Sequence, residues 1–459
     1  MLRWCGQYGI VFAASGTGCG CLLPSLFSFT RQGVMFSTYA DVLAHLDKVG
    51  LFHMDFGLHR MQAALQALGL MRPPFAVVQV LGTNGKGSTS TFLASMAQEQ
   101  GCTTGLYTSP HFVFPAERIR INGVMLAEER WAALGNAIME VRPDVTYFEF
   151  MTLLALLAFR ERKVRVAVIE AGLGGAHDAT TAFAADVLCY APIGMDHTAI
   201  LGNSLHAIAS DKAGAIRSAA PVCSAEQEPE ALAVLKAACA AHHAPLCLAP
   251  ALPRGTVLGL AGEHQRGNAA LAVAGWNALA AACALPNRAA ARAEGLKKAF
   301  FAGRLQQTKA FCSLPALWLD GAHNEHGMRA LALAIEQAAC PPVAVIFSCL
   351  KDKDWQAMSA LLLHAVGKQC PIVVPSLHNE RAAEADALVQ HLHSLGAQQV
   401  CAVADISLAF PLLEGEVPFG SRPVLVCGSL YLLSEFYRLF PQYLERSRAL
   451  CPAPTEEKV

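Results

Sequence analysis

A lysine inside a glycine-rich turn is the group in this sequence with the clearest chemical purpose. Residues 82–88 read GTNGKGS and follow an apolar, β-branched run at 77–81 that predicts a buried strand. We expect a helix after the turn, capped by Ser88 or Thr89. Glycines let backbone N–H groups converge on phosphate oxygens, the helix N-terminus adds partial positive charge, and Lys86 supplies a full one. The segment therefore predicts a nucleotide phosphate site; the alternative is an ordinary glycine turn.

Other polar side chains stand where further strands are expected to end. Lys86, Ser109, Glu170 and His197 each follow shortly after a short apolar run with strand character. The carboxyl ends of parallel strands meet at one edge of a sheet, where ligands bind, so we expect these four side chains to share a cleft. The alternatives are a surface charge for Glu170 and a satisfied core histidine for His197.

The elements that must position these groups alternate between strand and helix along most of the chain. This order predicts an α/β protein with a P-loop-containing, mostly parallel sheet domain, followed by a smaller α/β Rossmann-like domain. Residues 221–260 look less regular. We place the phosphate-binding domain at 35–303, the second α/β domain at 304–445 and a tail at 446–459. Residues 1–34 are expected to be a disordered extension or a misassigned start, with a poor signal peptide as the alternative.

The composition limits the classes of partner. Of the 459 residues, 54% are hydrophobic and 15% charged, and the net charge of −1 gives no electrostatic case for nucleic acid or an anionic membrane. The 16 cysteines form no C-x-x-C pair, a pattern typical of reduced thiols in a cytosolic protein. No stretch looks transmembrane. We therefore expect a cytoplasmic protein that acts on small molecules and binds neither nucleic acid nor membrane. The composition does not fix the oligomeric state, for which our expectation is a monomer.

Eleven short motifs follow one another in chain order: GTNGKGST, TSPH, ERIRINGV, TYFEFMTLLAL, VAVIEAGLGG, IGMDHTAILG, DKAGAI, GRLQ, LDGAHN, KDKD and CGSLYLL. They resemble the motifs of the folylpolyglutamate synthase and dihydrofolate synthase family, a branch of the Mur-type ATP-dependent amide ligases. The resemblance spans about residues 81–433. It implies an acid–amino-acid ligase that uses ATP and Mg²⁺ to add L-glutamate to folates through an acyl phosphate. It leaves open whether dihydropteroate is also an acceptor, which would make the enzyme bifunctional.

The resemblance also implies roles for individual residues. The catalytic group comprises Lys86, His323 and Lys212, the last as a carbamylated lysine able to support a second Mg²⁺. The ATP contacts are Gly85, Lys86, Gly87, Ser88, Asn268, Arg304 and Asp320. The Mg²⁺ ligands are Ser109, Glu170 and His197. The folate or dihydropteroate contacts are Thr146, Tyr147, Phe148, Glu149, His177, Asp178 and Ala179.

Two other functions compete with this one. The first is a Mur-type ligase acting on a peptidoglycan precursor, against which the TYFEF and ERIRING motifs favour folate. The second is a nucleotide-binding switch or kinase that is not a ligase. It would explain the glycine turn but not a second domain carrying Asp320 and His323. On residue types alone, Lys212 is an ordinary solvated charge on a helix, and the KDKD segment at 351–354 is equally well a solvated turn.

Overall fold

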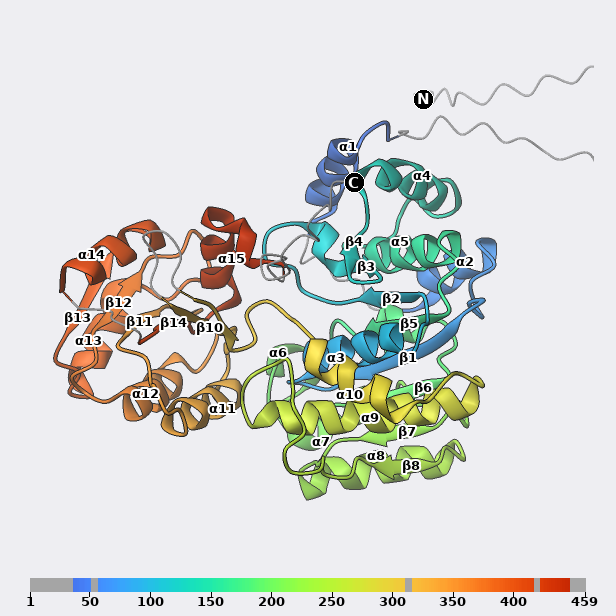
Figure 1. The fold of residues 1–459 in the computed structure, drawn as a ribbon. Helices are drawn as coiled ribbons and strands as arrows, with labels where there is room; N and C mark the ends of the chain where they lie inside the picture. Colours follow the sequence, from blue (N-terminus) through green and yellow to red (C-terminus); the bar gives the residue numbers. More distant parts are fainter. Residues whose placement is uncertain (1–35, 51–56, 310–315, 417–421, 446–459) are drawn as a thin grey trace, which may run out of the picture. The chain divides into compact units, whose positions relative to one another are not determined.

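The computed structural model describes residues 36–50, 57–309, 316–416 and 422–445. The predictions for residues 1–34 and 446–459 lie outside the described residues. The described residues form two sheets, and the chain completes the first before it begins the second (Figure 1).

The first sheet has eight strands in the order β4-β3-β2-β5-β1-β6-β7-β8. The strands from β2 to β8 in this order pair in parallel, and the β2–β3–β4 edge is antiparallel. The bounds are β1 (Ala76–Leu81), β2 (Thr104–Tyr107), β3 (Ile119–Ile121), β4 (Val124–Met125), β5 (Val166–Glu170), β6 (Val187–Tyr190), β7 (Val222–Ser224) and β8 (Leu246–Leu248).

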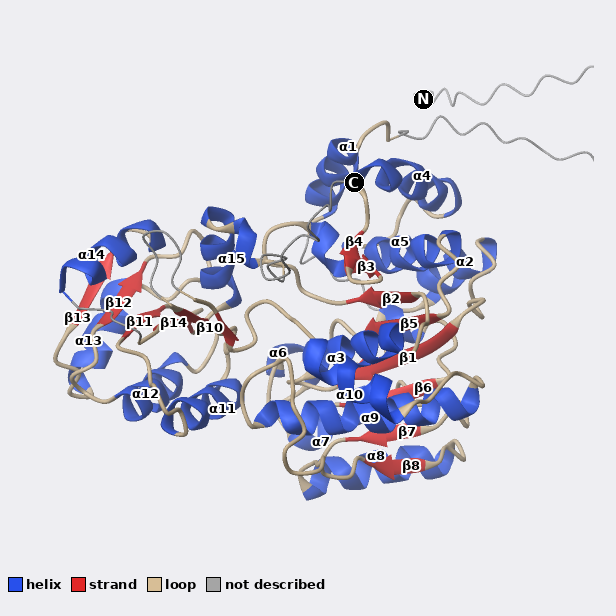
Figure 2. Ribbon diagram, in the orientation of Figure 1, coloured by secondary structure: helices blue, strands red, loops and turns tan. Residues whose placement is uncertain are grey.

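Helices cover both faces of this sheet (Figures 1 and 2). Successive strand residues face opposite ways, so Val77 of β1 joins the apolar cluster under α5, while Val78 joins the cluster under α3 and α9. Because both faces are covered, β1 is apolar almost throughout. The helices are α1 (Tyr39–Val49), α2 (His59–Ala67), α3 (Lys86–Glu99), α4 (Trp131–Val141), α5 (Tyr147–Glu161), α6 (Thr198–Leu201), α7 (Leu205–Ala213), α8 (Pro229–Ala241), α9 (His264–Ala282) and α10 (Ala289–Lys298).

Helix α10 approaches α3 backbone to backbone. A Cβ added to Gly295 would lie 2.5 Å from Met96 Cα, and Ser95 Oγ donates to the Gly295 carbonyl at 2.7 Å. Any side chain at position 295 would therefore push the two helices apart.

The second sheet has six strands in the order β13-β12-β11-β14-β10-β9, all parallel except the β9–β10 pair. One apolar cluster lies under α11, α12 and α13, and another under α14 and α15. The strands are β9 (Gln306–Gln307), β10 (Leu317–Leu319), β11 (Ala344–Phe347), β12 (Ile372–Pro375), β13 (Val400–Val403) and β14 (Val424–Cys427). The helices are α11 (Glu325–Glu336), α12 (Trp355–Val366), α13 (Ala385–Ser394), α14 (Ala409–Glu416) and α15 (Leu430–Leu439).

The predicted fold class is confirmed, with two local errors. Helix α3 begins at Lys86 with Gly85 as its N-cap, so the cap predicted at Ser88 or Thr89 is wrong. Gly85 has φ of 87°, a conformation that glycine adopts without steric cost, and the helix has no side-chain cap. Residues 221–260 contain β7, α8 and β8, so the expectation of irregular structure there is wrong as well. We keep 303–304 as our proposed domain boundary, in the segment between α10 and β9.

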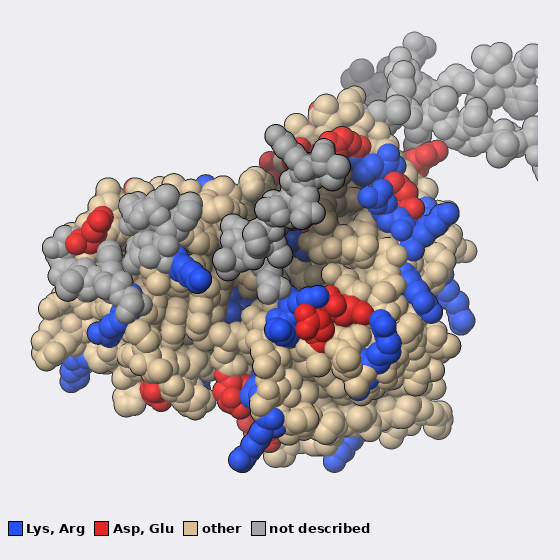
Figure 3. All heavy atoms as spheres, viewed as in Figure 1, with Lys and Arg blue, Asp and Glu red and all other residues tan. Residues whose placement is uncertain are grey.

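The surface and the helices bear on possible partners. On the face seen in Figure 3, Lys and Arg lie among Asp and Glu rather than in one large patch of a single sign. Lys298, for example, pairs with Glu99 at 3.1 Å and with Glu294 at 3.3 Å. Among the described helices, none combines the length and apolar character needed to cross a membrane.

Candidate active site

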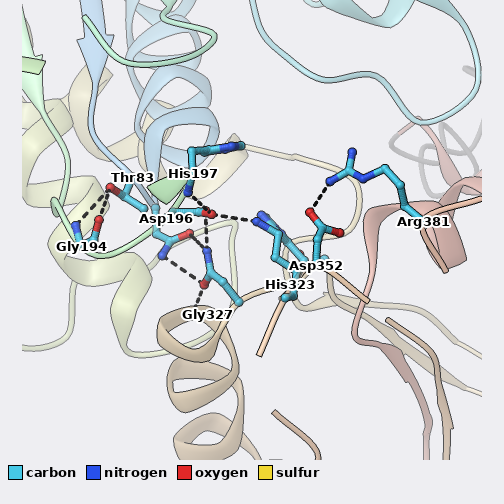
Figure 4. Close-up of polar contacts among 12 residues, drawn as sticks. Thr83, Gly194, Asp196, His197, His323, Gly327, Asp352 and Arg381 are labelled. Atoms are coloured by element: carbon cyan, nitrogen blue, oxygen red, sulfur yellow. Dashed lines mark hydrogen bonds and ion pairs between the residues drawn. The ribbon is translucent and has the colours of Figure 1, made fainter. Parts of the chain in front are cut away.

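The phosphate loop joins β1 to α3 and is tied to the segment that follows β6. Thr83 N donates to the Pro192 carbonyl at 2.9 Å, and Thr83 Oγ1 lies 3.1 Å from both the Gly194 nitrogen and its oxygen (Figure 4). The first N–H groups of α3 have no side-chain cap, which leaves donors for an anion at the helix N-terminus. Lys86 Nζ donates to the carbonyl of Thr83 at 3.0 Å, so its ammonium is held at the loop.

Groups predicted to contact ATP pack directly on this loop. A Cβ on Gly85 would lie 2.2 Å from Asn268 Oδ1, which places the amide of α9 against the loop backbone. A Cβ on Gly87 would lie 2.4 Å from the Phe301 ring, and the Arg304 guanidinium carbon lies 5.1 Å from that ring's centroid. Ser88 is buried in the first turn of α3. The structure therefore brings the glycine loop and Asn268 together, and it links Arg304 to them through Phe301.

Two of the three predicted Mg²⁺ ligands are in direct contact. Glu170 is 3% exposed, and its Oε2 accepts from Ser109 N at 3.0 Å, while Oε1 has no hydrogen-bond partner in the described part of the chain. Burial raises the pKa of Glu170, against the lowering influence of Lys86. His197 has an exposed side chain, and its ring points away from the Asp196 carboxylate (Figure 4). A buried carboxylate with one unused oxygen, bonded to the backbone of a serine, fits a hard divalent cation.

Lys212 lies buried in α7 behind the loop after β5. Its side chain is 4% exposed, and burial together with the nearby charge of Lys86 lowers its pKa to about 7. Tyr190 Oη donates to its carbonyl at 2.9 Å, which fixes the backbone there. A lysine with this pKa is partly a neutral amine near pH 7, the form that reacts with CO₂.

Polar atoms at two of the predicted folate contacts serve the start of α5. Thr146 is the N-cap, and it forms a capping box with Glu149, whose carboxylate also pairs with Arg60 at 3.1 Å. Tyr147 is buried, and the Phe148 ring covers Gly172, where a Cβ would lie 2.5 Å from it.

The loop after β5 holds the other three predicted folate contacts. Asp178 accepts from the N–H groups of Gly172 at 2.8 Å and Leu173 at 2.9 Å, so it shapes the glycine turn. Ala179 is buried beside it, and the His177 side chain is exposed. Asp178 thus organises the turn that Phe148 covers, whereas the side chain of His177 faces solvent.

The segment after β10 carries an acid and an imidazole that are satisfied locally. Asp320 is buried and accepts from Leu305 N at 2.7 Å and Ala322 N at 2.8 Å. His323 Nδ1 lies 2.7 Å from the Gly321 carbonyl, so this nitrogen is the donor and Nε2 is left as an acceptor. Burial lowers the pKa of His323 to about 4, which keeps the ring neutral at pH 7.

A polar network around Asp196 connects the phosphate loop with residues of the second sheet, and sequence reasoning missed it (Figure 4). Lys353 Nζ donates to Asp196 Oδ1 at 2.7 Å, and Asn324 Nδ2 donates to Asp196 Oδ2 at 3.0 Å. The amides of Asn324 and Asn84 exchange contacts at 3.3 Å. Burial would raise the pKa of Asp196, but the charges of His197 and Lys353 hold it well below its usual value. The KDKD motif was the feature of the sequence that could have indicated this network. The interpretation of KDKD as a solvated turn is wrong for Lys353, whose side chain is only 14% exposed.

Comparison with known proteins gives this arrangement a class and then a family. Residues 303–430 match the family model "Mur ligase, glutamate ligase domain". A phosphate-loop sheet followed by such a domain defines a Mur-type ligase. The chain is 36% identical over 360 residues to a dihydrofolate synthase/folylpolyglutamate synthase of Bacillus subtilis, covering 71% of this chain and 82% of that protein. The chain belongs to the folylpolyglutamate synthase/dihydrofolate synthase family.

Two solved structures agree with this assignment. One is E. coli FolC in complex with DHPP and ADP, with a TM-score of 0.76 and 29% identity over 88% of this chain and 98% of that one. The other is the bifunctional folylpolyglutamate synthase/dihydrofolate synthase of Yersinia pestis with AMPPNP and Mn ion. It has a TM-score of 0.78 and 28% identity over 90% of this chain and 100% of that one.

Proposed function

We propose that the protein ligates L-glutamate to a folate acceptor at the expense of ATP. The observation that carries the proposal is the meeting of an uncapped helix N-terminus, the Lys86 ammonium and the buried Glu170 carboxylate at one edge of a sheet, in a chain of this family. The acceptor carboxylate attacks the γ-phosphorus of ATP, ADP leaves, and an acyl phosphate forms. The glutamate amine then attacks the acyl carbon, phosphate leaves, and the amine loses a proton.

The residues at this edge divide the work. The N–H groups of residues 85–88 and Lys86 bind the phosphates and offset the charge that develops during transfer. Ser109, Glu170 and His197 would hold Mg²⁺, which supplies further neutralisation of phosphate charge. Asn268, Arg304 and Asp320 are proposed nucleotide contacts. Neutral His323 has an Nε2 lone pair available to accept a hydrogen bond from the glutamate amine.

Lys212 is proposed to act as its carbamate. The neutral amine attacks CO₂, an N–C bond forms, and the nitrogen releases a proton to water. The product is an anion in place of a cation, and it could support a second Mg²⁺. The acceptor contacts are proposed to come from Thr146, Tyr147, Phe148, Glu149, His177, Asp178 and Ala179.

The decisive assay combines purified protein, ATP, Mg²⁺ and labelled L-glutamate with one acceptor at a time: tetrahydrofolate, dihydropteroate or a peptidoglycan precursor. Label in the tetrahydrofolate product is expected. Label in the dihydropteroate product would add the second activity, which the name of the B. subtilis relative favours. ATP hydrolysis with no new amide would favour the non-ligase alternative, and label only in a peptidoglycan precursor would favour another Mur-type ligase. We also propose that the protein is cytoplasmic and monomeric. Sedimentation analysis would test the oligomeric state.

A further inference from the structure

Arg118 is a buried cation for which the roles above provide no use. It is 3% exposed and ends the short 3₁₀ helix Pro115–Arg118. Its carbonyl accepts from Thr108 N at 2.9 Å, and Thr108 directly precedes Ser109. Its Nε donates to His111 Nδ1 at 2.8 Å. Both ends of the residue are thus anchored to the loop after β2, the loop that contacts Glu170.

This guanidinium forms no direct ion pair in the described part of the chain; Glu170 is near enough for its pKa to be lowered by the charge but is not in contact with it. The adjacent Glu117 is already used, because its carboxylate accepts from the N–H groups of Phe112, Val113 and Phe114. The two terminal nitrogens of Arg118 have no hydrogen-bond partner among the described residues, and they are not sealed from solvent. Removing a guanidinium from water without an anion is costly, so the arrangement is expected where a ligand supplies the anion.

The neighbours of Arg118 indicate which ligand this is. Its guanidinium carbon lies 5.4 Å from the centroid of the Tyr147 ring, within cation–π range, and Tyr147 is a proposed acceptor contact. On its backbone side it adjoins Ser109, which touches Glu170 at 3.0 Å. An acidic group held here would lie between the acceptor pocket and the proposed metal ligands, where a reacting carboxylate must be.

We propose that Arg118 binds the reacting carboxylate of the acceptor acid through its two terminal nitrogens, with His111 and Tyr147 fixing its orientation. This proposal rests on the proposed function. A cation at this point offsets the repulsion between an incoming carboxylate and the phosphates of ATP. A phosphate oxygen would satisfy the same chemistry. We assign the carboxylate because Lys86 and the N-terminus of α3 already serve the phosphates, whereas Arg118 lies over Tyr147.

The kinetic test uses the full chain with Arg118→Met, and Arg120→Met as the matched control. Arg120 is a nearby arginine that donates to the Gly123 carbonyl at 3.0 Å and is outside the proposed site. Arg118→Met should raise KM for tetrahydrofolate at least about tenfold, the usual cost of losing a charged hydrogen-bonding partner. KM for ATP should change by less than about twofold on the same reasoning, and Arg120→Met should resemble the wild type. A raised KM for ATP with an unchanged KM for tetrahydrofolate would overturn the assignment in favour of phosphate.

A binding test separates carboxylate recognition from general damage. The comparison is between tetrahydrofolate and an analogue in which the γ-carboxylate of its glutamate is an amide. With a non-hydrolysable ATP analogue present, the wild type should bind tetrahydrofolate at least about tenfold more tightly than this γ-amide. Arg118→Met should bind the two alike. A preference retained in Arg118→Met, or one that follows the α-amide instead, would overturn the proposal. If Arg118→Met does not fold, Arg118→Lys is measured in the same way. Failure of ligation by the wild type would instead overturn the proposed function.

Discussion

Glu170 and Asp320 occupy equivalent places, one at the end of β5 and the other just after β10, and both are buried. Backbone N–H groups satisfy both oxygens of Asp320, whereas Glu170 has one oxygen bonded to Ser109 N and the other unused in the described residues. Arg118 is buried near Glu170 and Lys212 is buried near Lys86, and neither has an ion-pair partner in the described chain. His323, near Asp320, is neutral and bonded to its own loop.

The difference separates two ways of preparing a site. The edge of the first sheet keeps charges that only ligands can satisfy, so it gives up stability for binding and chemistry. The edge of the second sheet has satisfied its own polar groups, so it offers groups with fixed orientation. Substitutions at the first edge should therefore cost activity more than stability, and the following predictions test that contrast.

The largest effect is expected for Lys86→Ala. Its ammonium supplies full positive charge at the phosphate loop, and its loss should lower kcat by roughly 10³-fold or more. The fold should survive, because Lys86 bonds only to its own loop among the described contacts. Glutamate incorporation and thermal unfolding measure the two effects; normal ligation by this variant would remove the loop from the mechanism.

Lys212→Met should also lower kcat for ligation, though less than Lys86→Ala does, and it should stabilise the protein near neutral pH. The folded pKa of about 7 lies below the ordinary value of 10.5, so the unfolded chain binds this proton more tightly. The unfolding free energy of the wild type should therefore rise between pH 7 and pH 10. The rise is at most about 1.4 kcal/mol for each unit of difference between the folded and unfolded pKa values of Lys212. The variant should lose this dependence. Denaturant unfolding of both proteins at pH 7 and pH 10 in CO₂-depleted buffer measures this difference. An equal change of unfolding free energy with pH in the two proteins would contradict the prediction.

Lys353→Met should lower kcat by about tenfold, because it leaves the buried Asp196 carboxylate without its cation beside the phosphate loop. Lys351→Met is the matched control, since Lys351 is exposed and its ammonium donates only to the Glu380 carbonyl among the described contacts. Steady-state kinetics of both variants measure the difference. Equal activities would show that the Asp196 network does not support turnover.

The smallest effect is expected for Thr146→Ala. Loss of the N-cap should cost about 1 kcal/mol of unfolding free energy, and Thr38→Ala, which removes the same capping box from α1, should cost a similar amount. If Thr146 also contacts folate, only Thr146→Ala should raise KM for folate. An unchanged KM would confine Thr146 to the helix cap.

Local patterns predicted the first edge better than the second. The apolar run and glycines around Lys86 specify β1, the loop and α3 within a few residues of one another. Strands β8 and β13 escaped because they are short and partly exposed, so neither has the apolar run of a buried parallel strand. The start of α3 was misplaced because its N-cap is a glycine, which lacks the side-chain signal of Ser or Thr.

Contacts across long stretches of chain were beyond the reach of pattern reasoning. Asp196 and Lys353 are 157 positions apart, and only the folded chain shows that the lysine of the KDKD motif faces an acid. Arg118 was hidden for another reason. In ERIRING it reads as one charge in an alternating hairpin, and nothing local shows that Glu117 turns away from it to cap the backbone.

The close backbone approach of Gly295 to Met96 affects the spacing of two residues of the proposed nucleotide site. Helix α10 leads directly into residues 299–305, which carry Phe301 and Arg304, while α3 begins at Lys86. With no side chain between them, the two helices pack directly on each other; Lys86 begins α3, and Arg304 follows the end of α10. Gly295→Ala would increase the distance between α3 and α10. The added methyl group would thereby alter the spacing of Lys86 and Arg304 without touching either residue.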